Sequence, residues 1–504
     1  MSELNAPTPG PVPVHRGAGA VGPALPRAAA APLREFWEAH PRVADPRTLL
    51  VCAAVGVAGA VLLVGHSPGL GAAVTGLAVW AAALPALVRR RAVGALVTAG
   101  LSVALLAVVA VRDAGWVVGV CVATAAWAGA VAVTSGRSAT AVVLSPVSWA
   151  AGLVRALPWL VRGGRDLMGG RRGQLVVALR SIGVTVLLLM VFGALFASAD
   201  TVFSSYLPHI ELGSLPARLA VGALVAVGAA ALAHLALAPP AWSDVALPEA
   251  RPARRGEWLL PVLALDAMVL AFVLVQVGAL LGGHRHVLET AGLTYAEYAR
   301  EGFAQLMATT ALTLAVVAVG ARYAPRATAR DRVVSRVGLG VLCVGTLGVV
   351  ASALRRMDLY VDVFGLTRLR VFVVVVELVM AAVLVLVLVA GVRWRAGWLP
   401  RTVVQVVAVA MLGLAVANPD AMIARHNTAA GPDAPLMDLT YLQGLSADAV
   451  PVLDQLSEPW RSCVLGGAHV DAPQGPADWN LGRERAATVL ASGASTSGVP
   501  LCSP

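Results

Sequence analysis

Lysine is missing from this 504-residue sequence, and charge of either sign is scarce. Only 13% of the residues are charged while 58% are hydrophobic, a balance that excludes an ordinary soluble domain. All 38 basic residues are arginines, and the net charge is +10. A basic balance suits either nucleic acid or anionic lipid. Because these arginines lie in short segments between long apolar runs, we predict a protein of the lipid bilayer with no nucleic-acid partner.

Several signatures of chemistry are also missing. The sequence contains no Cys-x-x-Cys pair, Walker loop or zincin helix. His284 and His286 flank Arg285, with Glu289 nearby, but no further Cys or His lies at a diagnostic spacing for a metal. We therefore predict no metal site and no cofactor, and whether the protein is an enzyme stays open.

Long apolar runs are what the sequence has in abundance. Crossing a hydrocarbon core of about 30 Å takes roughly 20 apolar residues. Eleven runs qualify: Thr48 to Gly65, Leu70 to Val88, Ala92 to Val111, Trp116 to Thr134, Leu175 to Ser198, Leu219 to Ala238, Trp258 to Leu281, Phe303 to Tyr323, Val337 to Leu354, Val371 to Val392 and Val403 to Ala417. We predict an all-α, multi-pass integral membrane protein with about eleven transmembrane helices, placed in a bacterial cytoplasmic membrane.

The arginines predict the orientation of these spans, because basic residues accumulate in cytoplasmic loops. With the N-terminus in the cytoplasm, 25 arginines lie in cytoplasmic segments and 12 in outer ones, and Arg180 lies within a span. The C-terminal region is then extracytoplasmic. The apolar segment from Ala139 to Val161 is the main rival for a further span. It carries Arg155, Pro146 and Pro158, and counting it would place the arginine-rich loops outside, so we predict an amphipathic segment on the inner leaflet.

These patterns divide the chain into six parts. We predict a disordered cytoplasmic tail (1–47), four N-terminal spans (48–134), an interfacial segment (135–173), a seven-helix core (174–417), an outer polar segment (418–453) and an extracytoplasmic tail (454–504). Cys463 and Cys502 lie in that tail, where an oxidising compartment permits a disulfide between them, with two free thiols as the alternative.

Polar residues gather at the outer ends of the predicted spans, in four segments. These segments are Phe196 to Phe203, Thr294 to Phe303, Arg355 to Arg370 and Asn418 to Asn427. Together with Asp438 to Leu442 and Leu445 to Pro451, they resemble an uncharacterised bacterial family of polytopic membrane proteins, catalogued as a domain of unknown function, the 4153/4173 group. The resemblance covers roughly Gln174 to Leu453 and implies a multi-helix membrane protein, without any activity or catalytic residue to transfer.

The arginines of the outer segments depart from the preference of basic residues for the cytoplasmic side. We therefore expect a ligand or a partner side chain to offset the energetic cost of placing them outside. One hypothesis is an anion site built from Arg300, Arg355, Arg356, Arg368, Arg370 and Arg425. The alternative is that salt bridges to outer carboxylates neutralise them and join the helix ends. The polar residues that we expect around them are Asp200, Glu297, Tyr298, Glu301, Asp358, Tyr360, Asp362, Asn418, Asp420 and Asn427.

Three charged residues fall inside predicted spans, where charge is costly. Arg180 and Asp266 lie at similar depths and could pair, as an ion relay or as a neutralised structural contact. Glu377 lies about 10 Å below the outer end of its span, counting about 1.5 Å per residue.

Three functions remain open at this point. The leading hypothesis is a cell-envelope protein that acts at the outer interface on an anionic lipid or lipid-linked phosphate. The second is a secondary transporter, supported by the intramembrane charges, although no inverted repeat of broken helices is visible. The third is a non-catalytic scaffold or sensory subunit whose outer C-terminal region contacts an unknown protein partner.

Overall fold

The computed structural model describes residues 44–167, 212–240, 242, 254–281, 303–394, 396–429, 438–466 and 470–492, with scattered positions between 169 and 196. Every regular element in these residues is a helix. The long helices are α2 (Pro46–Leu63), α3 (Leu70–Arg89), α4 (Val93–Ala107), α5 (Gly115–Thr134), α6 (Ala139–Leu167), α9 (Leu215–Leu237), α10 (Arg255–Leu281), α13 (Phe303–Tyr323), α14 (Ala329–Phe364), α15 (Arg368–Arg393) and α16 (Leu399–Ala417). Shorter helices are η1 (Val108–Ala110), η2 (Leu212–Ser214), α17 (Pro419–Thr428), α18 (Leu439–Gln443), η4 (Ala447–Ala449), α19 (Val450–Leu453), α20 (Trp460–Leu465) and α21 (Leu481–Ser492).

Eleven helices of the described residues are long and apolar enough to cross a membrane. Ten of them coincide with predicted spans, which confirms the all-α membrane architecture. The eleventh is α6, which we predicted to be interfacial. The predicted span from Leu175 to Ser198 lies largely outside the described residues and stays a prediction, as does the tail over residues 1–43.

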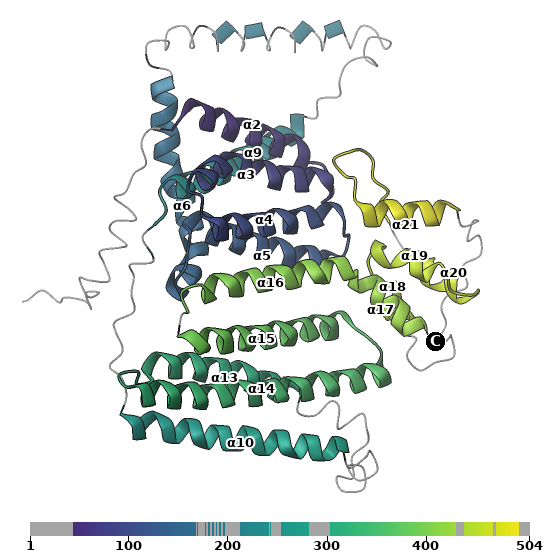
Figure 1. The fold of residues 1–504 in the computed structure, drawn as a ribbon. Coiled ribbons are helices and arrows are strands. Elements are labelled where there is room, and N and C mark those ends of the chain that lie inside the picture. The colour runs from purple at the N-terminus through teal and green to yellow at the C-terminus, as the bar shows by residue number, and fades with distance from the viewer. Residues whose placement is uncertain are drawn as a thin grey trace, which may run out of the picture.

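The direction of α6 distinguishes it from the other long helices. Figure 1 shows α2, α3, α4, α5 and α16 stacked with their axes roughly aligned, whereas α6 runs steeply across their ends. The face of α6 that packs on α9 and α5 carries small and polar residues, among them Ser145, Gly152 and Arg155, which are buried. Large apolar side chains of α6, such as Val143 and Val154, are exposed. This direction is the one expected of a helix that lies along a membrane surface, and the interfacial position of α6 stays a prediction.

The long helices form two neighbouring groups, and the helices of both groups end at the same two faces of the molecule. In one group α9 packs on α2 and α3, and α16 packs on α4 and α5; in the other, α10, α13 and α15 surround α14. The end of the bundle beside α6, where α5 and α9 finish, is called the inner face below. The opposite end, where α3 and α5 begin and α16 finishes, is called the outer face. These names follow the predicted orientation.

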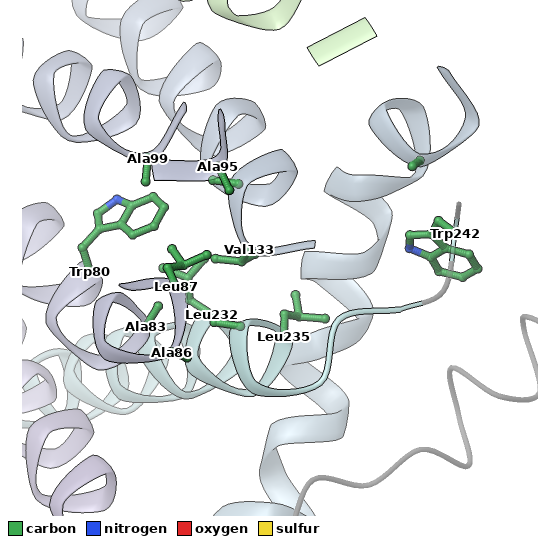
Figure 2. Packing of buried hydrophobic residues seen from close by; sticks show 13 residues of the cluster. Trp80, Ala83, Ala86, Leu87, Ala95, Ala99, Val133, Leu232, Leu235 and Trp242 are labelled. Carbon is green, nitrogen blue, oxygen red and sulfur yellow. The ribbon is translucent and has the colours of Figure 1, made fainter. Parts of the chain in front are cut away.

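Small residues allow the helices of the first group to approach closely. A side chain added at Gly56 of α2 would meet the carbonyl oxygen of Gly222 in α9 at 2.8 Å, the close backbone approach typical of membrane helix pairs. Larger side chains fill the inner end of the group. Figure 2 shows Leu87 beside Val133 there, with Leu232 and Leu235 of α9 below them.

The C-terminal residues are folded against the outer face. The described residues from 438 to 492, which carry α18 to α21, are called the outer cap, and Figure 1 shows them in yellow at one end of the bundle beyond α16. Its core includes Leu442, Val464 and Ala486. Cys463 is disulfide-bonded. Its expected partner, Cys502, lies outside the described residues, so the Cys463–Cys502 pairing stays a prediction.

Candidate functional site

Asp420 is the point where the outer ends of three helices meet. It lies in the first turn of α17 and is fully buried. Its carboxylate accepts hydrogen bonds from Arg368 of α15 (Nε at 3.0 Å and Nη2 at 2.6 Å), from Trp116 Nε1 of α5 at 3.0 Å and from the Ser446 N–H of the cap at 2.9 Å. The two-pronged contact with Arg368 is the geometry in which a guanidinium binds a carboxylate most strongly. Arg368 is therefore occupied by this protein's own carboxylate.

The surroundings of Asp420 also determine its ionisation. Burial on its own would raise the pKa of Asp420, but the hydrogen bonds from Arg368, the Ser446 N–H and Trp116 outweigh burial and hold this pKa below its ordinary value. The Arg368 guanidinium donates further to the Gly444 carbonyl at 3.0 Å, and the Arg368 N–H donates to the Tyr441 hydroxyl at 2.8 Å. The pair thus joins α15 to the outer cap.

A pH dependence follows from the lowered pKa of Asp420. A carboxyl group with a lower pKa in the folded state contributes stability above its unfolded pKa of about 3.9, and this contribution is lost as the pH falls through the folded value. We expect the melting temperature of the wild type to exceed that of Asp420→Asn at neutral pH. The difference should shrink as the pH falls below the ordinary range of aspartate. A difference that stays constant down to strongly acidic pH would contradict the assignment.

Arg370 is also used within the protein. Its Nη1 donates to the carbonyl oxygens of Phe364 (2.8 Å) and Gly365, and its guanidinium lies 4.3 Å from the centroid of the Tyr360 ring. These contacts complete the tight connection between α14 and α15, where Gly365 has a positive φ of 72°.

The same connection is held from α17 by Asn427. Its side chain accepts from the Leu366 N–H at 2.7 Å and donates to the Leu366 carbonyl at 3.0 Å. A Cβ on Gly365 would lie 2.9 Å from Asn427 Oδ1, so only glycine fits at this position. Asn427 therefore has a structural role.

The other described arginines of the predicted anion site are Arg355, Arg356 and Arg425. Arg355 pairs with Asp358 at 2.9 Å, and both side chains are about half exposed or more (48% and 61%). Arg356 is half-buried, and Asp362 is exposed. Arg425 is exposed on α17, and no ion pair or hydrogen bond holds it within the part of the chain described here. Among the described arginines of the predicted anion site, Arg425 is thus exposed and is not held by another side chain.

A second contact region, which sequence reasoning missed, ties the cap to α4 and α5. Asp448 accepts from the N–H groups of Asp113 (2.7 Å) and Ala114 (2.9 Å) at the start of α5. Burial outweighs these hydrogen bonds and raises the pKa of Asp448. Asn480 donates to the carbonyls of Val109 and Arg112, both at 2.9 Å. Arg112 in turn donates to the Ala415 carbonyl at 2.6 Å, at the end of α16.

A third contact region lies beside α3. Asp478 accepts from the Ser67 N–H at 2.8 Å and lies 3.2 Å from His66 Nδ1. The stretch from Gly65 to Gly69 reads Gly-His-Ser-Pro-Gly and so has the spacing of a nucleophile elbow, a signal that the sequence analysis overlooked. The geometry is not that of a catalytic triad, because Asp478 binds both His66 and Ser67, and no hydrogen bond joins His66 to Ser67 in this described stretch. The three residues attach the cap.

An apolar groove opens between α15 and α16, in the outer half of the bundle. It has a volume of about 740 Å³. Its walls are Val97, Leu101, Leu366, Val371, Val374, Val375, Leu378, Val379, Ala382, Gln405, Val406, Val409, Ala410, Gly413, Leu414, Ala417 and Met422. Gln405 is the one polar residue among them, and it already donates to Gly94 O and Thr98 Oγ1. The groove therefore suits a hydrocarbon chain.

The intramembrane charges are not brought together. Asp266 is buried and its Oδ1 has no hydrogen-bond partner in the described residues, whereas Arg180 is exposed. Glu377 is fully buried, and both of its carboxylate oxygens lack such a partner. None of the three lines the groove.

Several predicted site residues lie outside the described residues, and their roles stay predictions. They are Asp200, Glu297, Tyr298, Arg300, Glu301 and Cys502. The histidines that follow α10 in the sequence, His284 and His286, also lie outside the described residues. Asn418 is described, and it forms the left-handed junction between α16 and α17 with a φ of 51°.

The fold and this outer contact network define a multi-pass, all-helical membrane protein. The chain belongs to the family described as "Domain of unknown function (DUF4153)", whose model matches residues 100–456. The match starts well before Gln174, where the motifs placed it, and so takes in α5 and α6. No curated protein and no solved structure matches the chain.

Proposed function

We propose that the protein binds an anionic lipid, or a lipid-linked phosphate, of the outer leaflet. One chain of this lipid lies in the groove between α15 and α16, and its headgroup lies beside Arg425. The observation that carries the proposal is the apolar groove of about 740 Å³ at the outer end of the bundle. A groove of this kind, open toward lipid and with no free polar group on its walls, selects hydrocarbon over a water-soluble solute.

The dimensions of the groove agree with a single leaflet. Its wall runs along α16 from Gln405 to Ala417, a length of about 18 Å at about 1.5 Å per residue. One leaflet contributes about half of the roughly 30 Å hydrocarbon core. A lipid tail could thus fill the groove while its headgroup remains at the level of α17.

Charge supports an anionic headgroup. Met422 of α17 lines the outer mouth of the groove, and Arg425 follows it by one helical turn, with an exposed side chain. The other guanidiniums near this mouth, those of Arg368 and Arg370, are bound within the protein. Among the described residues, Arg425 is therefore the cation available to a phosphate.

A photo-crosslinking experiment tests the proposal. Purified protein is incubated with phosphatidylglycerol that carries a diazirine on one acyl chain, and the adducts are mapped by peptide mass spectrometry. We expect adducts on the outer halves of α15 and α16. Gly413→Leu should abolish them, because a Cβ at Gly413 meets no atom within 4 Å and points into open space in the groove wall. Arg425→Gln should weaken labelling about tenfold, the loss expected for one charge-assisted hydrogen bond.

Matched variants serve as controls. Gly228→Leu makes the same change at a glycine of α9 that also has open space around it, and Arg485→Gln removes an exposed charge from the cap. Both should label like the wild type. Adducts that persist in Gly413→Leu at the wild-type level would rule out the groove as the binding site.

The two alternatives differ in their structural support. A transporter should have a cavity lined by its intramembrane charges, and the groove contains none of them. The scaffold hypothesis gains from the ordered cap, whose α21 presents exposed Glu484 and Arg485 on the outer face. If the photoactivatable phosphatidylglycerol labels every variant above as strongly as the wild type, the outer cap is the better candidate for the functional surface.

A further inference from the structure

A second cavity lies at the other end of the molecule, between the inner ends of α13, α14 and α15. These are the ends on the α6 side of the bundle in Figure 1. The cavity has a volume of about 340 Å³. Its deep walls are apolar and include Val317, Leu339, Cys343 and Val387. Cys343 is a free thiol, buried to 1% exposure.

The mouth of this cavity is basic. Arg326 and Arg336 both line it. Arg326 stacks on Trp394, with its guanidinium carbon 4.4 Å from the ring centroid, and also donates to the Ala321 carbonyl. These contacts orient the Arg326 guanidinium without neutralising it, since neither partner carries a negative charge.

No carboxylate of the described residues pairs with Arg326 or Arg336. The closest acidic residue along the chain is Asp331, and it is already used as a helix cap. Its Oδ2 accepts from the Thr328 N–H at 3.1 Å and from Thr328 Oγ1 at 2.7 Å. The exposed Arg336 has no hydrogen bond or ion pair of its own within the described residues. Two positive charges thus border an apolar cavity, and the described residues supply no counter-charge to either of them.

We propose that this cavity is a binding site for an anionic phospholipid of the inner leaflet, with the phosphate between Arg326 and Arg336 and one acyl chain extending past Cys343. A basic mouth above an apolar pocket between transmembrane helices is the arrangement expected for anionic headgroups on the cytoplasmic side. The site is separate from the outer groove and does not depend on the function proposed for it.

The depth of the cavity distinguishes a lipid from a small anion. Arg336 and Cys343 are separated by about 10 Å along α14, at about 1.5 Å per residue. This distance is about two thirds of one leaflet, given a core of roughly 30 Å. Inorganic phosphate would occupy only the mouth and leave the apolar walls unfilled.

Filling the cavity gives the sharpest test. Gly340 lines it, and a Cβ at this position meets no atom within 4 Å, so Gly340→Leu inserts a side chain where the lipid tail would lie. With the same photoactivatable phosphatidylglycerol, we expect wild-type adducts on α14 between Arg336 and Cys343. Gly340→Leu should remove them. The double variant Arg326→Gln/Arg336→Gln should reduce them at least tenfold, the size expected when charge-assisted contacts are lost.

Two control variants make the same change in charge and the same change in side-chain volume outside the cavity. Arg330→Gln removes an exposed charge from the same end of α14, outside the cavity, and Gly119→Leu adds the same volume at an open glycine of α5. Both should label like the wild type. If Gly340→Leu fails to fold, Gly391→Leu replaces it, because Gly391 also lines the cavity and has open space around it.

Three results would overturn the proposal. The first is inner adducts that persist in the filled variant, and the second is an equal loss in the control variants. The third is competition by inorganic phosphate as strong as that by unlabelled phosphatidylglycerol, which would define a site for a free anion. Adducts in the outer groove are measured on separate peptides from α15 and α16. A negative result for the outer groove therefore leaves the test of the inner cavity unaffected.

Discussion

Arg368→Ala should release the outer cap from α15 while the membrane helices stay folded. The substitution leaves the fully buried Asp420 without its cationic partner. Removing one member of a buried pair costs about 3–5 kcal/mol. Arg368 is 36% exposed, and Trp116 and the Ser446 N–H continue to donate to Asp420, so we expect a smaller cost of about 1–3 kcal/mol here. Amide hydrogen exchange measures this local opening directly, as lost protection of residues 438–446.

The matched control for that experiment is Arg355→Ala. It removes an arginine from the same outer segment, but its partner Asp358 is 61% exposed. Exposed pairs contribute about 0–1 kcal/mol, so exchange in the cap should stay as in the wild type. Equal protection in Arg368→Ala and the wild type would show that the Arg368–Asp420 pair does not hold the cap.

Gly69→Ala should open the cap at a different place. Gly69 precedes α3, and a Cβ there would meet the carbonyl oxygens of Trp479 (2.6 Å) and Asp478 (2.8 Å), which are backbone atoms. The same stretch forms hydrogen bonds from the Leu70 N–H to Trp479 O (2.7 Å) and from the Gly71 N–H to Ala477 O (2.9 Å). An added methyl group forces these two segments of the chain apart, at an expected cost of about 1–3 kcal/mol in stability.

The measurement is again hydrogen exchange, now over residues 477–483. Gly475→Ala is the control, since it lies in the same loop of the cap and a Cβ there meets nothing within 4 Å. We expect faster exchange in Gly69→Ala alone. Faster exchange in both variants would mean that the loop, and not its contact with α3, is responsible.

Hydrophobic runs predicted the membrane helices well, because a span must satisfy its backbone hydrogen bonds within itself and so carries its whole signal in one continuous stretch. Ten predicted spans are long apolar helices in the structure. The same reasoning identified Arg368 and Asp420 as charges that need compensation. It left open whether they bind a ligand or each other, and the structure shows that they bind each other.

The contacts of the outer cap could not be predicted in this way. Trp116 and Asp420 are 304 positions apart, and Asp113 and Asp448 are 335 apart. Nothing local in the sequence links such residues, since each pairing depends on the order in which the helices pack. In the described part of the predicted tail, Asn480, Asp478 and Arg483 bind the outer helix ends, and these contacts hold residues 470–492 against the bundle.

The two predicted lipid sites both depend on which face of the protein lies outside the cell. Single cysteines at two exposed positions measure this directly: Arg485→Cys in α21 of the cap and Arg330→Cys at the inner end of α14. The native thiols of Cys52, Cys121 and Cys343 are buried and should react slowly. With a membrane-impermeant maleimide on intact cells, we predict labelling at position 485 and none at position 330 until the membrane is permeabilised. Labelling at position 330 in intact cells, with position 485 protected, would contradict the account.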